Sequence, residues 1–586
     1  MRRSLSQEPT QPSDTKRMRS DTDKAQLYDR QLRLWKKTGQ AALESSIVCV
    51  LGSSALASES LKNLVLPGIG EMIVIDDARV DEQDIKTNFF VRPDDTGKPR
   101  ACCVVENLRE LNPEVRGLAI VASPAAAVQA SGEQEPAAAL DSASLVICCN
   151  QPDSLVCELS RKCSETGKPL IVATSAGFMS RIRTSVAEHA AIESHVDEKP
   201  DLRIMCPFAS LRDHVDSIDL SALDQTDIAH VPYIVLIIKA LQKFAAGNGD
   251  SGSRWANYPE RLTRNEKKEL CNVIRHLASV KPDEENFEEA TKSVMPQCMP
   301  YEIPNEIKQI LNDPAAATAV DFSTAATECR SNLTQQFNRR FWLLANALRR
   351  YVASDYAEGK LPLSGTIPDM KADTMGYIAL QKVFKSKADQ DKRQLAKHVA
   401  RVLEEAHLPS DYFSQEEIDV FCKNANKLRL KRMSAVHDEH ANGPENLSML
   451  EINGALNHYV LFRASAEFFA KNSRYPGAPA LNSMDKESLV ANDLNALVDS
   501  DTIELSAIAK DLLAKWKGSN DGEGSVPADM VTEFARSGFS ELHNIASVSG
   551  GVIAQEAIKL ITHQYVPGNN TFIFDGIQGR LLTAKV

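Results

Sequence analysis

The chain has 586 residues, too many for one hydrophobic core, so two or more domains are expected. Hydrophobic residues make up 43% and charged residues 25%, the balance of an ordinary soluble globular protein. Lys and Arg number 67 against 79 Asp and Glu, which gives a net charge of −12. This charge disfavours a nucleic-acid partner, because phosphate binding needs a basic surface.

The twelve cysteines include no C-x-x-C pair, which argues against a zinc site, and we expect no metal site in this chain. The start lacks an apolar signal segment, and no apolar run looks long enough to span a bilayer. We therefore expect no membrane association. Cysteines within apolar runs suit a reducing compartment, so we expect a location in the cytosol, the nucleus or both.

Residues 1–24 are polar, rich in Pro and Ser, and almost free of large apolar side chains. Such a segment cannot bury enough surface to offset its chain entropy, so we predict a disordered tail. Ordered structure is predicted to begin at YDRQLRLWKKTGQAAL. There Tyr28, Leu32 and Trp35 recur at helical spacing and form one apolar face.

A strand is predicted at SIVCVLG, ending at Gly52, and the helix that follows is closed by Pro67 and Gly68. EMIVIDD is predicted as a second strand, GKPRACCVVENLRELNPEV as a second helix, and SLVICCN and PLIVATSAG as further strands. Strands that alternate with helices in this way indicate a parallel sheet of βαβ units. The Gly-bearing first turn, and Asp76 about 24 residues later, are typical of nucleotide-binding sheets.

The pattern changes beyond about residue 180. RIRTSVAEHAAIES alternates like an edge strand, and long amphipathic helical patterns such as RFWLLANALRRYVA follow. Near the C-terminus, IASVSGGVIAQEAIKLITHQYVPGNNTFIFD is predicted as a Gly-rich turn, a helix, a turn and a strand. We therefore predict an α/β domain in two segments, residues 25–180 and 531–586, interrupted by a mainly helical insertion over residues 181–530.

The turn after the first strand, GSSALA, is a degraded phosphate-binding turn. Such turns need glycines so that backbone N–H groups can approach phosphate oxygens. Gly52 keeps the first glycine position and Ala57 is an accepted third residue, but Ser54 replaces the second glycine. This turn alone does not support a Rossmann-type oxidoreductase.

Longer stretches of the sequence are more specific. YDRQLRLWKKTGQAALESSIVCVLG, ESLKNLVLPGIGEMIVIDDARV, NFF, GKPRA and LRELNP resemble the Rossmann-like ThiF/MoeB-type adenylation fold of ubiquitin-like modifier activating enzymes. RIRTSVAEHAAIESHVDEKPDLR, PDEENFEEATKSV, LPLSGTIPDMKADTMGYIALQKVF and GGVIAQEAIKLITHQYVPGNNTFIFD resemble one family within that fold, the regulatory subunits of Nedd-type activating enzymes. The resemblance extends from about Tyr28 to Phe574.

The resemblance also shows what is missing. Active members carry an Asn-x-x-Arg-Gln stretch, a lysine and a magnesium-binding Asp; this chain has DIKTNFFV, Arg100 and CCNQP instead. The resemblance implies that Asp76 is the remaining ribose ligand, but Ala78 replaces the second family acid. Three lost charge-assisted hydrogen bonds, at about 1.5–3 kcal/mol each, would remove about 5–9 kcal/mol of nucleotide affinity. We expect Gly52 and Asp76 to be remnants of a cofactor site, with ATP and magnesium bound by the partner subunit.

The resemblance implies no catalytic residue in this chain. Catalytic subunits carry a thioester-forming cysteine, usually in a Cys-Thr dipeptide, and zinc held by two C-x-x-C pairs; neither motif occurs here. The middle region is therefore similar to half of a catalytic-cysteine domain without the cysteine. We expect that the chain is not an enzyme alone and that none of its cysteines carries the modifier.

Arg30 in YDRQLRL matches the family arginine that reaches across the dimer into the partner's ATP site. On a helix, Arg30 lies roughly opposite Tyr28, because two residues rotate the chain by about 200°. We expect Tyr28 to anchor the helix and Arg30 to point outward. The alternative is an ordinary surface arginine.

The resemblance implies a heterodimer with a catalytic subunit that adenylates a ubiquitin-like modifier with MgATP and forms its thioester. The modifier and its conjugating enzyme are the other expected partners. Two alternatives stay open. One is the regulatory subunit of the sumoylation activating enzyme, which lacks an insertion of about 350 residues; the other is a non-enzymatic adaptor that keeps the fold.

Overall fold

The computed structural model describes residues 24, 26–130, 134–197, 199–246, 255, 258–277, 284–319, 332–479, 491–517, 525–568 and 570–586. The predicted tail lies outside the described residues, apart from Lys24. The chain divides into two compact units. The sheet unit comprises residues 1–187, 433–562 and 567–586, and the helical unit comprises residues 188–432 and 563–566. The predicted insertion, 181–530, is longer than the helical unit, because residues 433–530 belong to the sheet unit.

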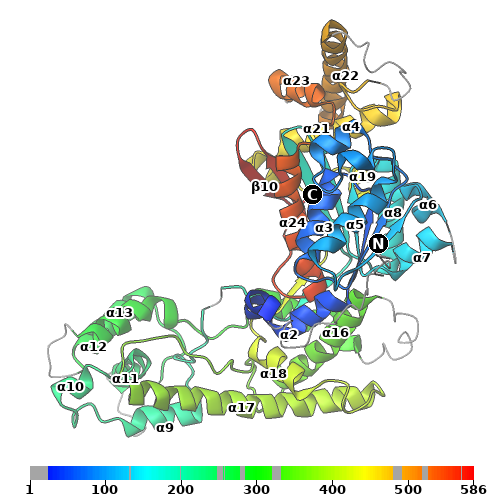
Figure 1. The fold of residues 1–586 in the computed structure, drawn as a ribbon. Coiled ribbons are helices and arrows are strands. Elements are labelled where there is room, and N and C mark those ends of the chain that lie inside the picture. Colours follow the sequence, from blue (N-terminus) through cyan, green and yellow to red (C-terminus); the bar gives the residue numbers. More distant parts are fainter. Residues whose placement is uncertain are drawn as a thin grey trace, which may run out of the picture. The chain divides into compact units, whose positions relative to one another are not determined.

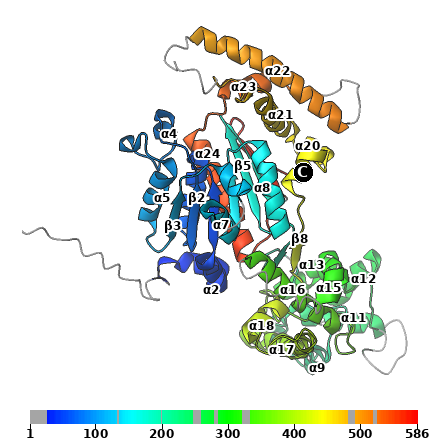
Figure 2. The same ribbon diagram turned by 90° about the vertical axis from the view of Figure 1, so that its right-hand side faces the viewer.

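The sheet unit is built on an eight-stranded sheet with the order β10–β9–β6–β5–β4–β1–β2–β3 (Figure 2). Its strands are β1 Ile47–Leu51, β2 Glu71–Ile75, β3 Arg116–Ile120, β4 Leu145–Cys149, β5 Leu170–Ala176, β6 Met179–Ser185, β9 Thr571–Asp575 and β10 Arg580–Ala584. Strands β1 to β5 run parallel, and β1 lies between β2 and β4. The predicted parallel α/β fold, to which the chain returns at its C-terminus, is confirmed.

Strand β6 corrects one prediction. The alternating stretch that contains it was expected to form an edge strand, but β6 pairs antiparallel with β5 on one side and with β9 on the other. Every residue of β6 is buried, including Arg181 and Arg183. Some of these polar side chains have polar partners inside the protein: Ser180 forms a hydrogen bond with Ser549, and Arg183 donates one to Glu439.

Helices cover both faces of the sheet, since alternate strand residues are apolar on both sides. On one face lie α2 Asp29–Ser45, α3 Ala55–Val65, α5 Arg100–Leu111 and α24 His543–Thr562, packed over side chains such as Val48 and Val50 (Figure 1). On the other lie α6 Pro124–Gln129, α7 Glu135–Ser142 and α8 Asp153–Thr166, packed over Cys49 and Leu51. The short helices α4 Glu82–Thr87 and η1 Pro93–Asp95 connect β2 to α5.

A third core explains why residues 433–530 belong to the sheet unit. Residues 433–537 form α19 Val436–Asn442, α20 Leu447–Ile452, α21 Leu456–Asn472, α22 Ala491–Lys517 and α23 Ala528–Ser537. Helices α21, α22 and α23 lie together (Figure 2). Tyr459 of α21 and Phe534 of α23 share one apolar cluster with Met179 of β6 and Ile573 of β9. This burial against the sheet makes residues 433–530 part of the sheet unit. No local sequence pattern indicates that these helices pack there.

Helix α24 corrects a second prediction. The expected Gly-rich turn does not form, because α24 begins at His543 and runs through Gly550. A Cβ atom at Gly550 would lie 2.8 Å from backbone atoms of Glu59 and Ser60, so this glycine allows close packing of α24 on α3. Within the described residues, α24 is also the one helix long and apolar enough to cross a membrane, yet 61% of the qualifying window is buried. Burial in the core accounts for its apolar character.

The helical unit contains α9 Ala209–Ser217, α10 Gln225–Ile228, α11 Tyr233–Ala246, α12 Arg264–Arg275, α13 Glu285–Gln297, α14 Asn305–Asn312, α15 Pro314–Thr318, α16 Leu333–Val352, α17 Thr374–Glu405 and α18 Gln415–Lys423. Strands β7 His189–Ala191 and β8 Arg429–Lys431 form a small antiparallel sheet. Helix α17 spans 32 residues and contributes apolar side chains to two cores. Leu380 and Phe384 pack in one, and Leu395 and Val399 pack with α16 in the other.

Candidate functional site

The turn between β1 and α3 lies at the carboxyl end of the central strand, where parallel α/β sheets bind ligands. Gly52 adopts φ +90°, and a Cβ atom there would lie 2.9 Å from the Cys149 carbonyl oxygen. Both the left-handed backbone and this close approach require glycine. The sequence therefore identified the position of the turn correctly, while the role of Gly52 in binding a cofactor stays a prediction.

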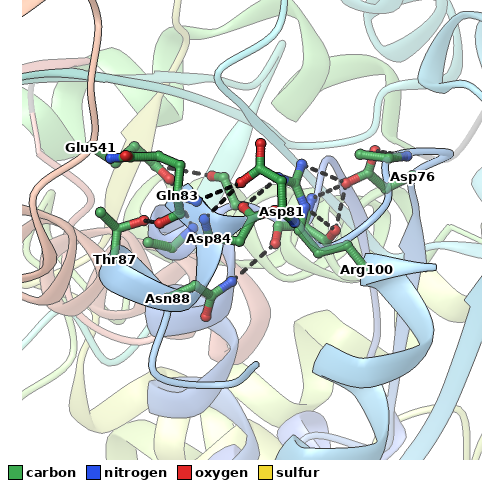
Figure 3. Close-up of polar contacts among 12 residues, drawn as sticks. Asp76, Asp81, Gln83, Asp84, Thr87, Asn88, Arg100 and Glu541 are labelled. Carbon is green, nitrogen blue, oxygen red and sulfur yellow. Dashed lines mark hydrogen bonds and ion pairs between the residues drawn. The ribbon is translucent and has the colours of Figure 1, made fainter. Parts of the chain in front are cut away.

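The N-terminus of α3 is occupied by a carboxylate of the chain itself. Glu541 Oε2 accepts a hydrogen bond from the Ala55 backbone N–H at 2.9 Å, and Oε1 accepts one from the Leu56 N–H at 3.2 Å. The Ser54 hydroxyl donates to Oε1 at 3.0 Å. Backbone N–H groups at such a helix start are the usual donors to a nucleotide phosphate. Here they are satisfied by Glu541, which comes from the connection between α23 and α24 (Figure 3).

Sequence reasoning missed Glu541. It follows Ser54 by 487 residues, and its neighbours carry no motif that links it to the first turn. The signal that the sequence did offer was an acidic residue just before the start of α24. Acidic residues are common at helix N-termini for local electrostatic reasons, so this signal does not point to a contact with the first turn.

Asp76 lies at the end of β2 and is buried, with 4% of its surface exposed. Its carboxylate accepts hydrogen bonds from the Ser53 backbone N–H at 2.9 Å, from the Ser53 hydroxyl and from the Ala78 N–H at 3.1 Å. Arg100 forms an ion pair with it at 2.9 Å. Burial alone would raise the pKa of Asp76, but Arg100 and the Ser53 hydrogen bond outweigh it and hold the pKa below the ordinary value.

Arg100 stands where active family members have a phosphate-neutralising lysine, yet its charge is already engaged. The guanidinium donates to Asp76, to Asp84 Oδ1 at 2.7 Å and to the Ser53 hydroxyl at 3.1 Å (Figure 3). Burial would lower the pKa of Arg100, but the two carboxylates outweigh it and raise the pKa. One cation against two anions leaves this cluster with a charge of −1. A polyphosphate entering here would meet net negative charge rather than a free cation.

We expect Arg100→Met to destabilise this corner by about 1–3 kcal/mol, because it leaves two carboxylates poorly solvated and unpaired. The side chain of Arg100 is 19% exposed, so the full penalty of a completely buried charge does not apply. Amide hydrogen exchange in peptides from α4 and α5 measures the loss. Lowering the pH should restore part of the lost protection, because the pKa of Asp76 rises once Arg100 is removed and the carboxylate then becomes protonated more easily. The control is Arg116→Met, because Arg116 pairs with Glu71 but is 71% exposed; equal effects of the two changes would contradict the prediction.

Two other stretches, DIKTNFFV and CCNQP, differ from the motifs of active family members, and each supplies an asparagine that forms structural hydrogen bonds. Asn88, in DIKTNFFV, is buried and donates to the Ser53 carbonyl at 3.3 Å and to the Ser58 hydroxyl at 3.1 Å. Asn150, in CCNQP, donates to Glu541 Oε1 at 2.6 Å. An amide that donates to a carboxylate is a poor substitute for the acid that would hold magnesium.

Arg30 lies away from this site, near the start of α2. Tyr28 is 3% exposed, and its hydroxyl accepts a hydrogen bond from Asn112 at 3.0 Å, whereas Arg30 is exposed. The structure thus confirms that Tyr28 is the anchor and that Arg30 points outward. Within the described part of the chain, Arg30 makes no ion pair, unlike Arg33, which pairs with Asp29 on the same helix. Its role toward a partner stays a prediction.

The sequence contains two pairs of adjacent cysteines, for which packing is the expected role; Cys103, Cys148 and Cys149 are buried as expected, but Cys102 is exposed. Cys148 and Cys149 end β4 in the sheet core, and burial raises the pKa of both thiols. Burial also raises the pKa of Cys49 to about 12. Thiols of this kind hold their protons at neutral pH and are poor nucleophiles.

Comparison with known proteins identifies the family of this chain. The ThiF family model matches residues 28–586. The chain is 35% identical over 563 residues to the NEDD8-activating enzyme E1 regulatory subunit of Danio rerio, covering 95% of this chain and 97% of that protein. It is 32% identical over 573 residues to the Drosophila melanogaster subunit of that name, covering 96% and 98%. It is 25% identical over 579 residues to the Saccharomyces cerevisiae subunit, covering 95% and 99%.

These matches span nearly the whole chain, including the helical unit, so the sumoylation alternative is not favoured. The resemblance inferred from the sequence motifs is confirmed. The chain belongs to the ThiF family and, within it, to the NEDD8-activating enzyme E1 regulatory subunits.

Proposed function

We propose that this chain pairs with a catalytic subunit to form a heterodimeric enzyme that adenylates NEDD8 with MgATP. The thioester then forms on the catalytic subunit, from which the modifier passes to a conjugating enzyme. In this proposal the chain completes the enzyme, but its own nucleotide-binding fold catalyses no reaction. The enzyme works in the cytosol, the nucleus or both.

The observation that carries the non-catalytic assignment is the Glu541 carboxylate at the N-terminus of α3. It takes the donors that a phosphate would need, at 2.9 and 3.2 Å from the two backbone nitrogens. The neighbouring cation, Arg100, is bound to Asp76 and Asp84. The residues present therefore do not fit ATP or its magnesium ion, and we assign both to the partner's site. Arg30 is the residue of this chain that we assign to that site, because it is exposed and unpaired by the described residues.

Pyrophosphate exchange tests this proposal. We expect no NEDD8-dependent exchange from the isolated chain, because its phosphate donors are already satisfied and its cation is neutralised. Adding the NEDD8-type catalytic subunit should give exchange well above that of the catalytic subunit alone. The measurement is radiolabelled ATP–pyrophosphate exchange, with the composition of each preparation checked by mass spectrometry.

The sumoylation-type catalytic subunit, tested with its own modifier, is the control. It should give no stimulation, since the relatives that match along the whole chain are NEDD8-type subunits. Exchange by the pure chain, or stimulation of the sumoylation-type subunit, would contradict the proposal.

A further inference from the structure

The pocket that holds Glu541 is more than the start of a helix. Two side chains from other elements add donors to Oε1: Asn150, which follows β4, at 2.6 Å, and the Ser175 hydroxyl near the end of β5, at 3.3 Å. Together with Ser54, Ala55 and Leu56, five donors converge on one carboxylate.

The donor with the shortest contact is itself held in position. The side-chain oxygen of Asn150 accepts a hydrogen bond from the Ser175 backbone N–H at 2.9 Å, so its amino group faces Glu541. Asn150 also adopts the left-handed backbone conformation, φ +52°, that an asparagine tolerates better than most residues. The orientation of this donor is therefore fixed by β5 and does not depend on Glu541.

We propose that this corner is a working carboxylate-binding site whose ligand is the chain's own, tethered Glu541. All five donors are neutral, which suits a single negative charge, and the neighbouring Asp76–Asp84–Arg100 cluster carries −1, which disfavours a polyphosphate. The start of α3 thus presents the backbone donors of an anion site, and its ligand is tethered to the chain rather than diffusible.

The tether also has a mechanical consequence. Glu541 precedes the first residue of α24, His543, by two positions, and its carboxylate is bound to the first turn of α3. The contact therefore fixes the start of α24 against α3, next to the close packing at Gly550. Glu541 is a positioning residue for the connection between α23 and α24.

Chemical rescue tests this assignment on the full-length chain. Glu541→Ala removes the carboxylate and leaves its five donors in place, so we expect the melting temperature of the sheet unit to fall by about 2–6 °C. Sodium formate or acetate should bind in the vacated space and restore most of this loss at roughly millimolar concentrations. Sodium chloride at equal ionic strength should not restore it. If the variant does not fold without the anion, the yield of soluble protein on refolding with and without acetate gives the same comparison.

Two further variants separate binding from a general salt effect. Glu541→Gln keeps the shape and fills the space, so it should be destabilised but should not respond to acetate. Glu533→Ala, which removes a glutamate on α23 that pairs with Arg536, should melt like the parent and show no acetate response. A Glu541→Ala chain that melts like the parent, or that responds equally to acetate and chloride, would overturn the proposal. Because Glu541 is intact in the exchange assay, that assay and this one can fail independently.

Discussion

Glu439→Ala is expected to cost about 3–5 kcal/mol, because it leaves a buried arginine without its partner. Arg183 and Glu439 are 1% and 2% exposed, and their side chains form an ion pair at 2.6 Å. Tyr459 donates a further hydrogen bond to Glu439 at 2.7 Å, and Arg183 also donates to the Ser434 carbonyl at 3.0 Å. The cluster joins β6, α19 and α21, so its loss should loosen the contact of these helices with the sheet.

Amide hydrogen exchange measures this effect locally, which is preferable in a chain with several cores. Peptides from α19 and α21 should lose protection, while those from α16 should not. Glu445→Ala is the matched control, because Glu445 pairs with Lys585 at 3.0 Å but is 57% exposed. It should change stability by less than about 0.5 kcal/mol. Similar exchange in the two variants would show that the buried pair contributes little.

The same pair predicts an acid dependence. Burial would raise the pKa of Glu439, but Arg183 and Arg181 outweigh it and lower the pKa to about 2. A carboxyl whose pKa is lower in the folded state stabilises the fold above its unfolded pKa, about 4.3, and this contribution is lost as the pH falls toward 2. Glu439→Gln should therefore flatten the loss of protection between about pH 4.5 and 2. An unchanged pH profile would assign the acid sensitivity to other carboxyls.

Arg30→Ala is expected to leave the heterodimer assembled and to slow adenylate formation in the partner's site by roughly 10–100-fold. The anchors of this helix are untouched, since Tyr28 and Trp35 are buried and Arg30 is exposed. A guanidinium that stabilises phosphate oxygens as pyrophosphate departs is worth about 1.5–3 kcal/mol, at about 1.4 kcal/mol per tenfold in rate. Arg30→Lys should recover only part of the rate, because an ammonium group lacks the planar fork of donors.

The measurement is single-turnover adenylation by the purified heterodimer, with its stoichiometry verified by mass. Arg33→Ala is the matched control: Arg33 lies on the same helix, is 76% exposed and forms a local ion pair with Asp29 at 2.8 Å. It should react at the parental rate. If Arg30→Ala pairs normally and also reacts at the parental rate, Arg30 is an ordinary surface residue and the contribution of this chain is architectural.

Local sequence patterns were sufficient to predict the elements whose signals are local. Apolar runs bounded by turn residues gave the parallel strands, helical spacing gave Tyr28 as an anchor opposite Arg30, and the turn at Gly52 was recognised from its own neighbours. The absence of a lysine and of acids at the expected places also indicated a nucleotide fold without catalytic function. These features depend on residues a few positions apart, which is the range over which periodicity and turn chemistry carry information.

Contacts between residues that are far apart in the sequence could be seen only in the folded chain. Strand β6 became an interior strand because β9, nearly 400 residues later, pairs with it. Gly550 lies within a helix, because α24 must approach α3 closely. Arg100 is paired with Asp84 as well as Asp76, and Glu541 accepts hydrogen bonds from the backbone at the start of α3. In each case the stabilising contact joins segments that no local pattern connects. The fold could thus be predicted, and the absence of catalysis in this chain stays a prediction; the groups that meet at the turn after β1 could not be predicted.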